Sequence, residues 1–543
     1  MDERPSRRSM PAAWPLVAVA VAYLTVMAVA FALSWQRNDS SFVYPIDDAY
    51  IHMAIAKNYV AHKTWGITRY EFSSSTSSPL WTVLIALTYA VFGVNAYSPL
   101  LINVLLSLGL LTLCWKALSD VLAPPAVFAA LCLVLFVTPL PALSLSGMEH
   151  VLHGLITVAA MHVTAGILTS PSPKRSEAWL LLLAPLLVAT RYEGLFLLAV
   201  IGALLAILKG RWRFPLVVGA LGVLPITLYG WWSVSHGWLF FPNSILLKGL
   251  RPGSGLRGVV EFVTGLRAMG TFYYAPHLLV VMLGALVALV LQYRHERMPG
   301  RNAYLLMMFV ASTLLHAQFA GVGWFHRYEA YLMLSGLFAL AHVTTNLPPL
   351  GSRRLRLNVG ALPLSVAVVA LSAVLIWPLE VRARTALTTM PQATTNIYEQ
   401  QCQMAKFLRT YYPSGSAAVN DIGCIAYFGD DLHILDLWGL GSLDVAKLRL
   451  TGSYATPQIR HIADRAGVKV AVVYDAWFTR FGGLPPQWIK VGEWTISNNV
   501  VAAEDTVSFY AVDPSEKDAL VRHLKAFSST LAPNVRQSGD YLR

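Results

Sequence analysis

Two adjacent aspartates stand in the stretch of sequence best suited to chemistry. Asp47 and Asp48 follow the first apolar run of the chain. Apolar residues after them recur at helical spacing and predict an amphipathic helix lying flat on a membrane: Ile51, Ile55 and Tyr59. At a helix start the macrodipole favours the ionised form of a carboxylate. An ionised carboxylate near lipid can act as general base on a hydroxyl, although helix capping is the commoner role of such a pair.

Basic residues in three separate predicted loops could bind a phosphate together: Arg191, Lys248 and Arg327. His326, which precedes Arg327, is a further candidate for contact with the phosphate. An arginine offers a planar fork that matches phosphate oxygens, and a lysine offers a compact charge. If the loops share one face of a membrane, these side chains can converge on one headgroup. The alternative is snorkelling, or pairing with a neighbouring acid, Arg191 with Glu193 and Arg327 with Glu329.

Further polar residues are candidates for contacts with a sugar or an acceptor. Glu149 and His150 begin a predicted helix; Glu149 could hold hydroxyls or a divalent ion, or merely stabilise the helix start. Asp421 and Trp438 follow predicted strands, where a turn can present a side chain beside a cleft. The histidines show no spacing typical of a zinc site. Two adjacent carboxylates could bind a divalent cation, but the sequence requires no cofactor.

The composition indicates that lipid surrounds much of the chain. Of its 543 residues, 56% are hydrophobic and 13% are charged, whereas soluble domains carry roughly 25% charged residues. The net charge of +12 falls in short clusters between apolar runs. This pattern suits membrane orientation and argues against nucleic-acid binding.

The apolar runs predict about eleven membrane-spanning helices. They are Ala12–Trp35, Pro99–Leu118, Pro125–Leu140, Val151–Leu168, Ala178–Ala189, Leu195–Leu208, Leu216–Trp232, Pro276–Leu291, Ala303–Ala320, Tyr328–Val343 and Val359–Pro378. A shorter run, Pro79–Phe92, is expected to lie in the membrane surface. This choice places the basic clusters on the cytoplasmic side: Arg4-Arg7-Arg8, Lys174-Arg175, Lys209-Arg211-Arg213, Arg294-Arg297-Arg301 and Arg353-Arg354-Arg356. The candidate residues above then lie together on the outer face. Ionisable groups at a membrane border cost free energy unless water solvates them or they serve a function.

The last part of the chain has the character of a water-soluble domain. We expect a membrane module over residues 1–378 and an extracytoplasmic α/β domain over residues 379–543. The patterns predict helices at Asn396–Tyr411 and Pro457–Arg465, and strands at Ala417–Asn420, Ile434–Leu437, Lys469–Val473 and Val507–Val512. Cys402 and Cys424 share this domain, so one disulfide is possible outside the cytoplasm.

The outer-face motifs, taken in order, resemble those of GT-C glycosyltransferases. The closest likeness is to actinobacterial arabinofuranosyltransferases that add terminal residues to cell-wall arabinan. The motifs are Asp47-Asp48-Ala49-Tyr50-Ile51, Ser75-Thr76-Ser77-Ser78-Pro79-Leu80-Trp81, Ser146-Gly147-Met148-Glu149, Arg191-Tyr192-Glu193-Gly194 and Pro242-Asn243-Ser244 followed by Lys248. The likeness covers about residues 10–340 and extends more weakly to Asp421-Ile422-Gly423. The Arg327-Tyr328 pair looks like one in lipid A aminoarabinose transferases of the same superfamily.

The resemblance implies a reaction and its partners. A sugar, arabinofuranose by the nearest likeness, would pass from a polyprenyl-phosphate donor to a cell-envelope glycan or glycolipid acceptor with inversion. An aspartate of the first outer loop would be the base: Asp47, or with less support Asp48. Glu149, His150, Glu193, Asn243, Asp421 and Trp438 would contact sugar or acceptor. The implied location is the bacterial inner membrane, with the N-terminus in the cytoplasm.

Two other functions fit the sequence less well. A lipid-linked glycan transporter or flippase should carry ionisable residues or broken helices near mid-membrane. Here the ionisable residues gather at one predicted face. A non-catalytic envelope assembly protein would rely on its outer domain and leave Asp47 dispensable.

Overall fold

A computed structural model describes residues 11–210, 212–249, 260, 264–295, 299–343 and 362–543. The predicted cytoplasmic clusters Arg4-Arg7-Arg8 and Arg353-Arg354-Arg356 lie outside the described residues, as do Arg211 and Arg297.

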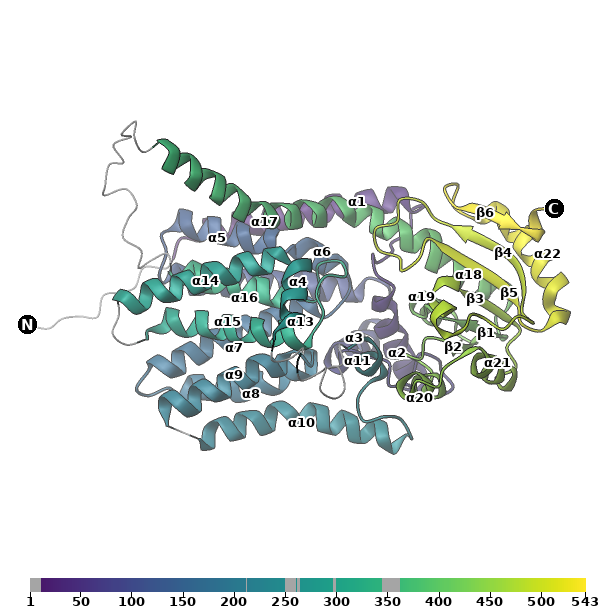
Figure 1. Ribbon diagram of the computed structural model, residues 1–543, viewed down its shortest axis with the longest axis horizontal. Helices are drawn as coiled ribbons and strands as arrows, with labels where there is room; N and C mark the ends of the chain where they lie inside the picture. Colours follow the sequence, from purple (N-terminus) through teal and green to yellow (C-terminus); the bar gives the residue numbers. More distant parts are fainter. Residues whose placement is uncertain (1–10, 211, 250–259, 261–263, 296–298, 344–361) are drawn as a thin grey trace, which may run out of the picture.

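Long helices packed side by side form the larger part of the molecule (Figure 1). They are α1 (Trp14–Arg37), α4 (Ser98–Ser119), α5 (Pro124–Val137), α7 (His150–Thr169), α8 (Lys174–Thr190), α9 (Gly194–Lys209), α10 (Arg213–Ser235), α14 (Pro276–His295), α15 (Arg301–Phe319), α16 (Ala330–Val343) and α17 (Leu362–Ile397). Within the described residues, each apolar run predicted to span the membrane lies mainly on one of these helices; residues 359–361 of the last run lie outside them. Within the described residues, five helices are long and apolar enough to cross a membrane: α1, α4, α7, α10 and α14.

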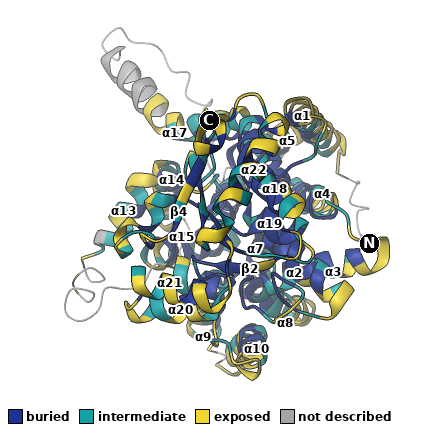
Figure 2. Ribbon diagram, turned by 90° about the vertical axis from the view of Figure 1, so that its right-hand side faces the viewer, coloured by how far each residue is buried: buried dark blue, intermediate teal, exposed yellow. Residues whose placement is uncertain are grey.

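The outer surface of this bundle is apolar. Figure 2 shows exposed residues along the outward faces of α1 and α10. Many of the exposed side chains are large and hydrophobic, among them Val17, Val21, Leu24, Leu101, Leu105, Leu216, Leu228 and Trp231. Exposed apolar side chains in this number are typical of a surface that lipid surrounds. The polytopic helical fold class predicted from the sequence is therefore confirmed.

Three shorter helices lie between the bundle and the C-terminal domain: α2 (Asp48–His62), α3 (Pro79–Phe92) and α11 (Asn243–Lys248) (Figure 1). Ser78 caps α3 by accepting a hydrogen bond from the Trp81 N–H, and Pro79 occupies its first turn. α2 begins at Asp48, as predicted, but it does not lie as an open amphipathic helix. It packs against α3 on one side and α19 (Gly423–Phe428) on the other, because apolar residues line more than one of its faces.

The C-terminal domain is built on a mixed six-stranded sheet in the order β2-β1-β3-β5-β4-β6. Its strands are β1 (Ser416–Val419), β2 (His433–Asp436), β3 (Val470–Val473), β4 (Ile489–Thr495), β5 (Thr506–Ala511) and β6 (Arg536–Gly539). β1 pairs in parallel with β2 and β3, and the remaining pairs are antiparallel. The four predicted strands are present; β4 and β6 were not predicted. Helices α18 (Gln403–Tyr411), α20 (Leu443–Thr451), α21 (Thr456–Arg465) and α22 (Lys517–Phe527) complete the domain.

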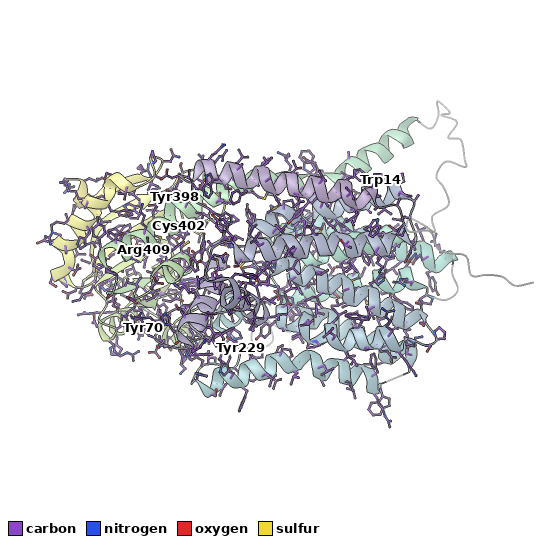
Figure 3. The ribbon with its side chains drawn as sticks, turned by 180° about the vertical axis from the view of Figure 1, so that it is seen from behind. Trp14, Tyr70, Tyr229, Tyr398, Cys402 and Arg409 are labelled. Atoms are coloured by element: carbon purple, nitrogen blue, oxygen red, sulfur yellow. The ribbon has the colours of Figure 1, made fainter. Side chains whose placement is uncertain are left out.

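One helix joins the two parts of the molecule. α17 passes through the predicted domain boundary at residue 378 and contains Pro378 and Pro391. It continues as a π-helical turn, η2 (Tyr398–Cys402), directly into α18. Cys402 lies in this segment, inside the C-terminal domain (Figure 3). Its sulfur is 3.3 Å from that of Cys424, and both are thiols.

The described residues also form shorter elements within the bundle and the C-terminal domain. They are α6 (Leu140–Leu145), α13 (Leu266–Tyr274), η3 (Asp475–Phe481), η4 (Pro514–Glu516), η5 (Ser528–Thr530) and η6 (Asp540–Leu542).

Candidate functional site

Asp48 is the meeting point of two basic residues that are far away in the sequence. Its Oδ1 lies 3.0 Å from Nζ of Lys248, which ends α11. Its Oδ2 accepts a hydrogen bond of 2.6 Å from Arg327, in the loop between α15 and α16. The Arg327 residue is only 2% exposed. The structure thus brings two of the three predicted phosphate ligands onto one carboxylate.

The two cations control the ionisation of Asp48. Burial raises the pKa of this carboxyl, but the charges of Lys248 and Arg327 outweigh burial and hold the pKa well below its usual range. The pKa of Lys248 is raised, because the attraction of Asp48 outweighs burial. All three groups are therefore charged at neutral pH. The pairing of Arg327 with Glu329, considered from the sequence, does not occur; Arg327 pairs with Asp48 instead.

Asp47 has a different environment. Its carboxylate accepts hydrogen bonds from the backbone N–H groups of Gly423 (2.6 Å) and Cys424 (2.7 Å), at the start of α19. A Cβ at Gly423 would lie only 2.0 Å from the Asp47 carbonyl oxygen, so glycine permits this close approach. Burial and the nearby charge of Asp421 raise the pKa of Asp47. Asp47 therefore joins the bundle side of the molecule to the C-terminal domain, while Asp48 contacts the cations.

Removing the Asp47 carboxylate should loosen this junction. In Asp47→Ala two buried N–H groups lose their acceptors, which costs about 1–3 kcal/mol each. We expect a lower melting temperature and faster proteolysis within the C-terminal domain. Asp430→Ala is the matched control, because Asp430 also bridges to α2, through Lys57, but its side chain is 74% exposed. An exposed pair contributes about 0–1 kcal/mol. Equal melting temperatures for the two variants would contradict the junction role.

The third predicted phosphate ligand, Arg191, is held by two carboxylates. It pairs with Glu149 and with Glu193, each at 2.6 Å. The predicted Arg191–Glu193 pairing is therefore present, and Glu149 adds a second partner. Burial raises the pKa of Glu193, but Arg191 outweighs burial and lowers it to about 2. The guanidinium is fixed at the end of α8 by these contacts.

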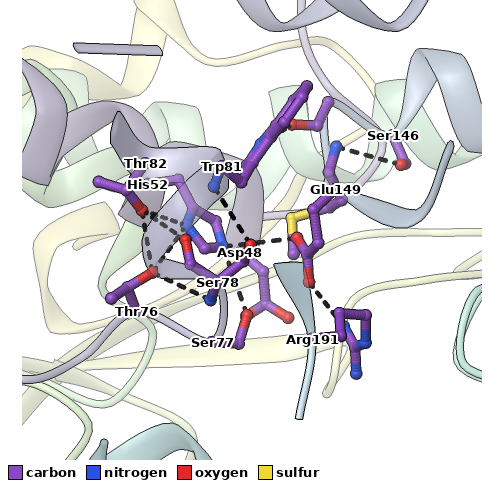
Figure 4. A network of polar contacts seen from close by, with 12 residues as sticks. Asp48, His52, Thr76, Ser77, Ser78, Trp81, Thr82, Ser146, Glu149 and Arg191 are labelled. Carbon is purple, nitrogen blue, oxygen red and sulfur yellow. Dashed lines mark hydrogen bonds and ion pairs between the residues drawn. The ribbon is translucent and has the colours of Figure 1, made fainter. Parts of the chain in front are cut away.

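His52 connects this ion-pair network to the serine- and threonine-rich loop before α3. Its Nε2 lies 3.8 Å from Glu149, and its Nδ1 is 2.8 Å from the Thr82 hydroxyl. Thr76 bonds both the His52 ring and Thr82, as Figure 4 shows. The loop that the sequence marked as a motif thus supports the site through hydrogen bonds. His52 was not predicted as part of it.

Two cavities meet at the Asp48 cluster. The first, about 310 Å³, lies toward the bundle and is lined in part by Asp48, Arg191, Glu193, Ser244, Lys248 and Arg327. The second, about 380 Å³, lies against the C-terminal domain and is lined in part by Asp47, Asp48, Asp421, Trp438, Lys248 and Arg327. Asp48, Lys248 and Arg327 line both. We call these the bundle cavity and the domain cavity.

Several polar atoms beside the cavities have no partner among the described residues. Nε and Nη1 of Arg327 are buried and donate no hydrogen bond to the described residues, and the Ser244 hydroxyl is likewise unpaired. Leaving a buried guanidinium N–H unpaired is costly. These atoms are covered by neighbouring side chains, so an anionic ligand in the bundle cavity would reach them only after those side chains move.

Tyr328 lies close to two of the cations. Its ring centroid is 5.1 Å from the Arg327 guanidinium and 5.8 Å from that of Arg191. It lines both cavities. An aromatic face near two cations favours their charged forms. The sequence singled out the Arg327-Tyr328 pair but not the contact with Arg191.

Four predicted site residues line neither cavity. Glu149 acts through Arg191, as described above. His150 is buried at the start of α7. Asn243 donates a 2.8 Å hydrogen bond to the Gly439 carbonyl, and so ties α11 to the turn after β2. The His326 carbonyl accepts a hydrogen bond from Arg382.

The domain cavity has an aromatic and basic wall. Trp438 and Trp477 have ring centroids 4.2 Å apart. The guanidinium groups of Arg449 and Arg480 lie 3.9 Å and 4.7 Å from the Trp438 ring. Buried Asp436 holds the turn by accepting hydrogen bonds from the Trp438 and Gly441 N–H groups. Of this wall, the sequence predicted Trp438 alone.

Asp421 also lines the domain cavity and lies near Asp47. It accepts hydrogen bonds from Gln401 (2.9 Å) and from the Tyr474 hydroxyl (3.1 Å). Gln401 belongs to η2, so the continuation of α17 reaches the cavity wall.

Comparison with known proteins agrees with this architecture. Residues 395–510 match the family described as domain of unknown function (DUF8728). No curated protein sequence matches the chain. Among solved structures, the fold is similar to ArnT from Cupriavidus metallidurans bound to undecaprenyl phosphate, with a TM-score of 0.56 and 13% identity over 93% of this chain and 99% of that one.

Two further structures are similar to the chain. ArnT from Cupriavidus metallidurans in the apo state gives a TM-score of 0.51 at 14% identity, over 92% of this chain and 99% of that one. AglB, the oligosaccharyltransferase from Archaeoglobus fulgidus, gives a TM-score of 0.44 at 13% identity, over 91% of this chain and 74% of that one. The likeness to the two ArnT structures shows a shared fold over nearly the whole chain, in agreement with the fold class predicted from the sequence.

Proposed function

We propose that this protein is a glycosyltransferase that takes a sugar from a polyprenyl-phosphate donor and transfers it with inversion. The observation that carries the proposal is the Asp48–Lys248–Arg327 cluster at the wall between two cavities. A transfer reaction needs a base beside the acceptor and cations beside the leaving phosphate. In this cluster the carboxylate of Asp48 is in direct contact with the two cations, Lys248 and Arg327.

The bundle cavity is the proposed donor site. Arg327 carries two buried unpaired nitrogens, and Ser244 carries an unpaired hydroxyl, so acceptor oxygens are missing there. A phosphate has the charge and the oxygens to fill these positions. Apolar residues of the same cavity, including Tyr192, Phe196 and Phe319, suit the first part of a lipid tail. ArnT, which has this fold, was solved with undecaprenyl phosphate bound.

Asp48, rather than Asp47, is the proposed base. While Lys248 and Arg327 bind Asp48 alone, its pKa is too low for efficient proton abstraction. A donor phosphate would share both cations and bring its own negative charge, and both effects raise the pKa of Asp48. The base would therefore become effective when the donor is bound.

The reaction follows from this arrangement. Asp48 takes the proton of an acceptor hydroxyl, and the hydroxyl oxygen bonds to the anomeric carbon from the face opposite the phosphate. The bond between that carbon and the phosphate oxygen breaks, and the electron pair leaves with the polyprenyl phosphate. Lys248 and Arg327 stabilise the charge on the leaving oxygen. One displacement inverts the anomeric configuration.

The domain cavity is the proposed acceptor site. Its tryptophans offer flat apolar faces of the kind that pack on sugar rings. Asp48 and Asp421 offer carboxylates for hydroxyl groups. A cell-envelope glycan or glycolipid fits this chemistry, and arabinofuranose remains the sugar implied by the sequence motifs.

The proposed location is the bacterial inner membrane, with both cavities outside the cytoplasm. The turn between α7 and α8 would then face the cytoplasm and the C-terminal domain would not. In a protein without native cysteines, Ser172→Cys and Ser529→Cys, both exposed, should react with an impermeant maleimide from opposite sides. Labelling of both from the same side would contradict this topology.

A direct test of the proposed function measures donor-side binding and turnover in purified protein. We expect undecaprenyl phosphate to bind in a 1:1 ratio by native mass spectrometry. We also expect at least one polyprenyl-phosphate sugar, with decaprenyl-phosphate arabinofuranose tested first, to be consumed when membrane glycans are supplied. Absence of undecaprenyl phosphate binding would refute the donor site, and binding without any consumption would favour a transporter.

A further inference from the structure

The loop that carries Arg327 has an unusual backbone. Trp324, Phe325 and His326 have φ angles of 43°, 60° and 61°, so three consecutive non-glycine residues are left-handed. For L-residues this region is unfavourable, and it is rarely occupied by several residues in a row. Such a turn persists only where the surrounding structure holds it. It stands immediately before Arg327 and Tyr328, which line both cavities.

A buried ion pair holds both ends of this left-handed turn. Glu329, fully buried, accepts a 2.7 Å hydrogen bond from the Gly323 N–H through Oε2 and pairs with Arg382 through Oε1. Arg382 donates a 2.7 Å hydrogen bond to the His326 carbonyl. The pair therefore binds the backbone just before the turn and at its last residue.

The same pair is anchored on other helices of the bundle. Arg382 Nε donates to the Val137 carbonyl at the end of α5, at 3.1 Å. His277 of α14 lies 3.2 Å from Glu329 and 2.9 Å from Arg382. Arg382, Glu329 and His277 thus meet in one cluster, together with the Val137 carbonyl. The arrangement is rigid because breaking one contact leaves a buried charge unpaired.

Arg382 belongs to α17, the helix that continues into the C-terminal domain (Figure 1). Fifteen residues further on, this helix passes into η2, whose Gln401 bonds to Asp421 in the domain cavity. The loop of the proposed donor site is therefore fixed by the helix that also forms part of the proposed acceptor site.

We propose that Arg382 and Glu329 form a positioning pair that sets the backbone of the 323–328 loop, so that Arg327 meets Asp48 and the donor phosphate. Neither Arg382 nor Glu329 is among the described residues that line the two cavities, so the pair acts on the site through the loop. This inference rests on the proposed function, since it assigns Arg327 to the phosphate.

The test measures undecaprenyl phosphate affinity of detergent-solubilised full-length protein. Arg382→Met should weaken binding by about tenfold or more, the size of a lost charged hydrogen bond. Arg384→Met is the matched control. Arg384 lies on the same helix, its side chain is 59% exposed, and it forms an exposed ion pair with Glu380. Its affinity should stay within twofold of that of the parent protein.

A double-variant cycle separates positioning from general destabilisation. In an Arg327→Met background, Arg382→Met should weaken binding no further, because the residue through which it acts is gone. Additive losses would overturn the inference. If Arg382→Met does not fold, Glu329→Gln and Arg382→Lys take its place in the same cycle; unchanged affinity in both would overturn it equally. If the parent protein itself fails to bind undecaprenyl phosphate, the proposed function fails first.

Discussion

Asp48→Asn should abolish most sugar transfer while leaving the protein folded. The amide cannot accept the proton of the acceptor hydroxyl, and a positioned general base contributes about 10²- to 10⁴-fold to rate. We expect a loss of kcat in this range, measured as consumption of the best polyprenyl-phosphate sugar at saturating concentration. Undecaprenyl phosphate should still bind, because Lys248 and Arg327 remain and the competing carboxylate charge is gone.

Asp47→Asn is the informative companion of this variant. Its carboxylate oxygens accept two backbone N–H groups of the C-terminal domain, so an amide at this position loses one acceptor. The main effect should be a lower melting temperature, with the folded fraction retaining turnover within about tenfold, the scale of one neutral hydrogen bond. If Asp47→Asn lost kcat and Asp48→Asn did not, Asp47 would be the base.

Lys248→Met and Arg327→Met should each weaken undecaprenyl phosphate binding by about ten- to hundredfold, since a charged hydrogen bond contributes about 1.5–3 kcal/mol. The loss should shrink at high salt because part of the attraction is screened. Lys209→Met is the control, because Lys209 ends α9 and hydrogen-bonds Ser170, on neither cavity wall. Wild-type affinity in both cavity variants would contradict the phosphate site.

The same variants should shift the pH dependence of kcat/KM. Asp48 acts as base only when ionised, so activity falls as the pH drops through its pKa. In the parent protein Lys248 and Arg327 keep that pKa below its usual range. Removing either cation raises the pKa, and the acid limb of the profile should move to higher pH. If the acid limb of the kcat/KM profile stays at the same pH, the ionisation of another group controls it.

The sequence predicted the elements well and their contacts less well. Apolar runs mark the bundle helices because lipid demands long hydrophobic segments. By contrast, β6 (Arg536–Gly539) is polar and pairs only with β4 at the edge of the sheet, so it lacks the apolar pattern of a strand. α17 continues past Pro378 although proline usually ends a helix. Packing of residues such as Ala386 and Met390, both buried, stabilises it there.

Pairings between distant residues lay beyond what spacing can show. Asp47 and Asp48 differ by one step on a helix, which turns a side chain by about 100°. That rotation separates a carboxylate against α19 from one against Lys248 and Arg327. Glu329 is near Arg327 in sequence, yet it pairs with Arg382, 53 residues away. Only the folded bundle decides between such partners.

The most direct test of the central claim is an experimental structure with undecaprenyl phosphate bound. We predict phosphate oxygens in the bundle cavity, within about 2.7–3.2 Å of Lys248 Nζ and an Arg327 nitrogen, and the Asp48 carboxylate facing the domain cavity. A phosphate bound away from both cations, with the Asp48–Lys248–Arg327 cluster undisturbed, would contradict the account.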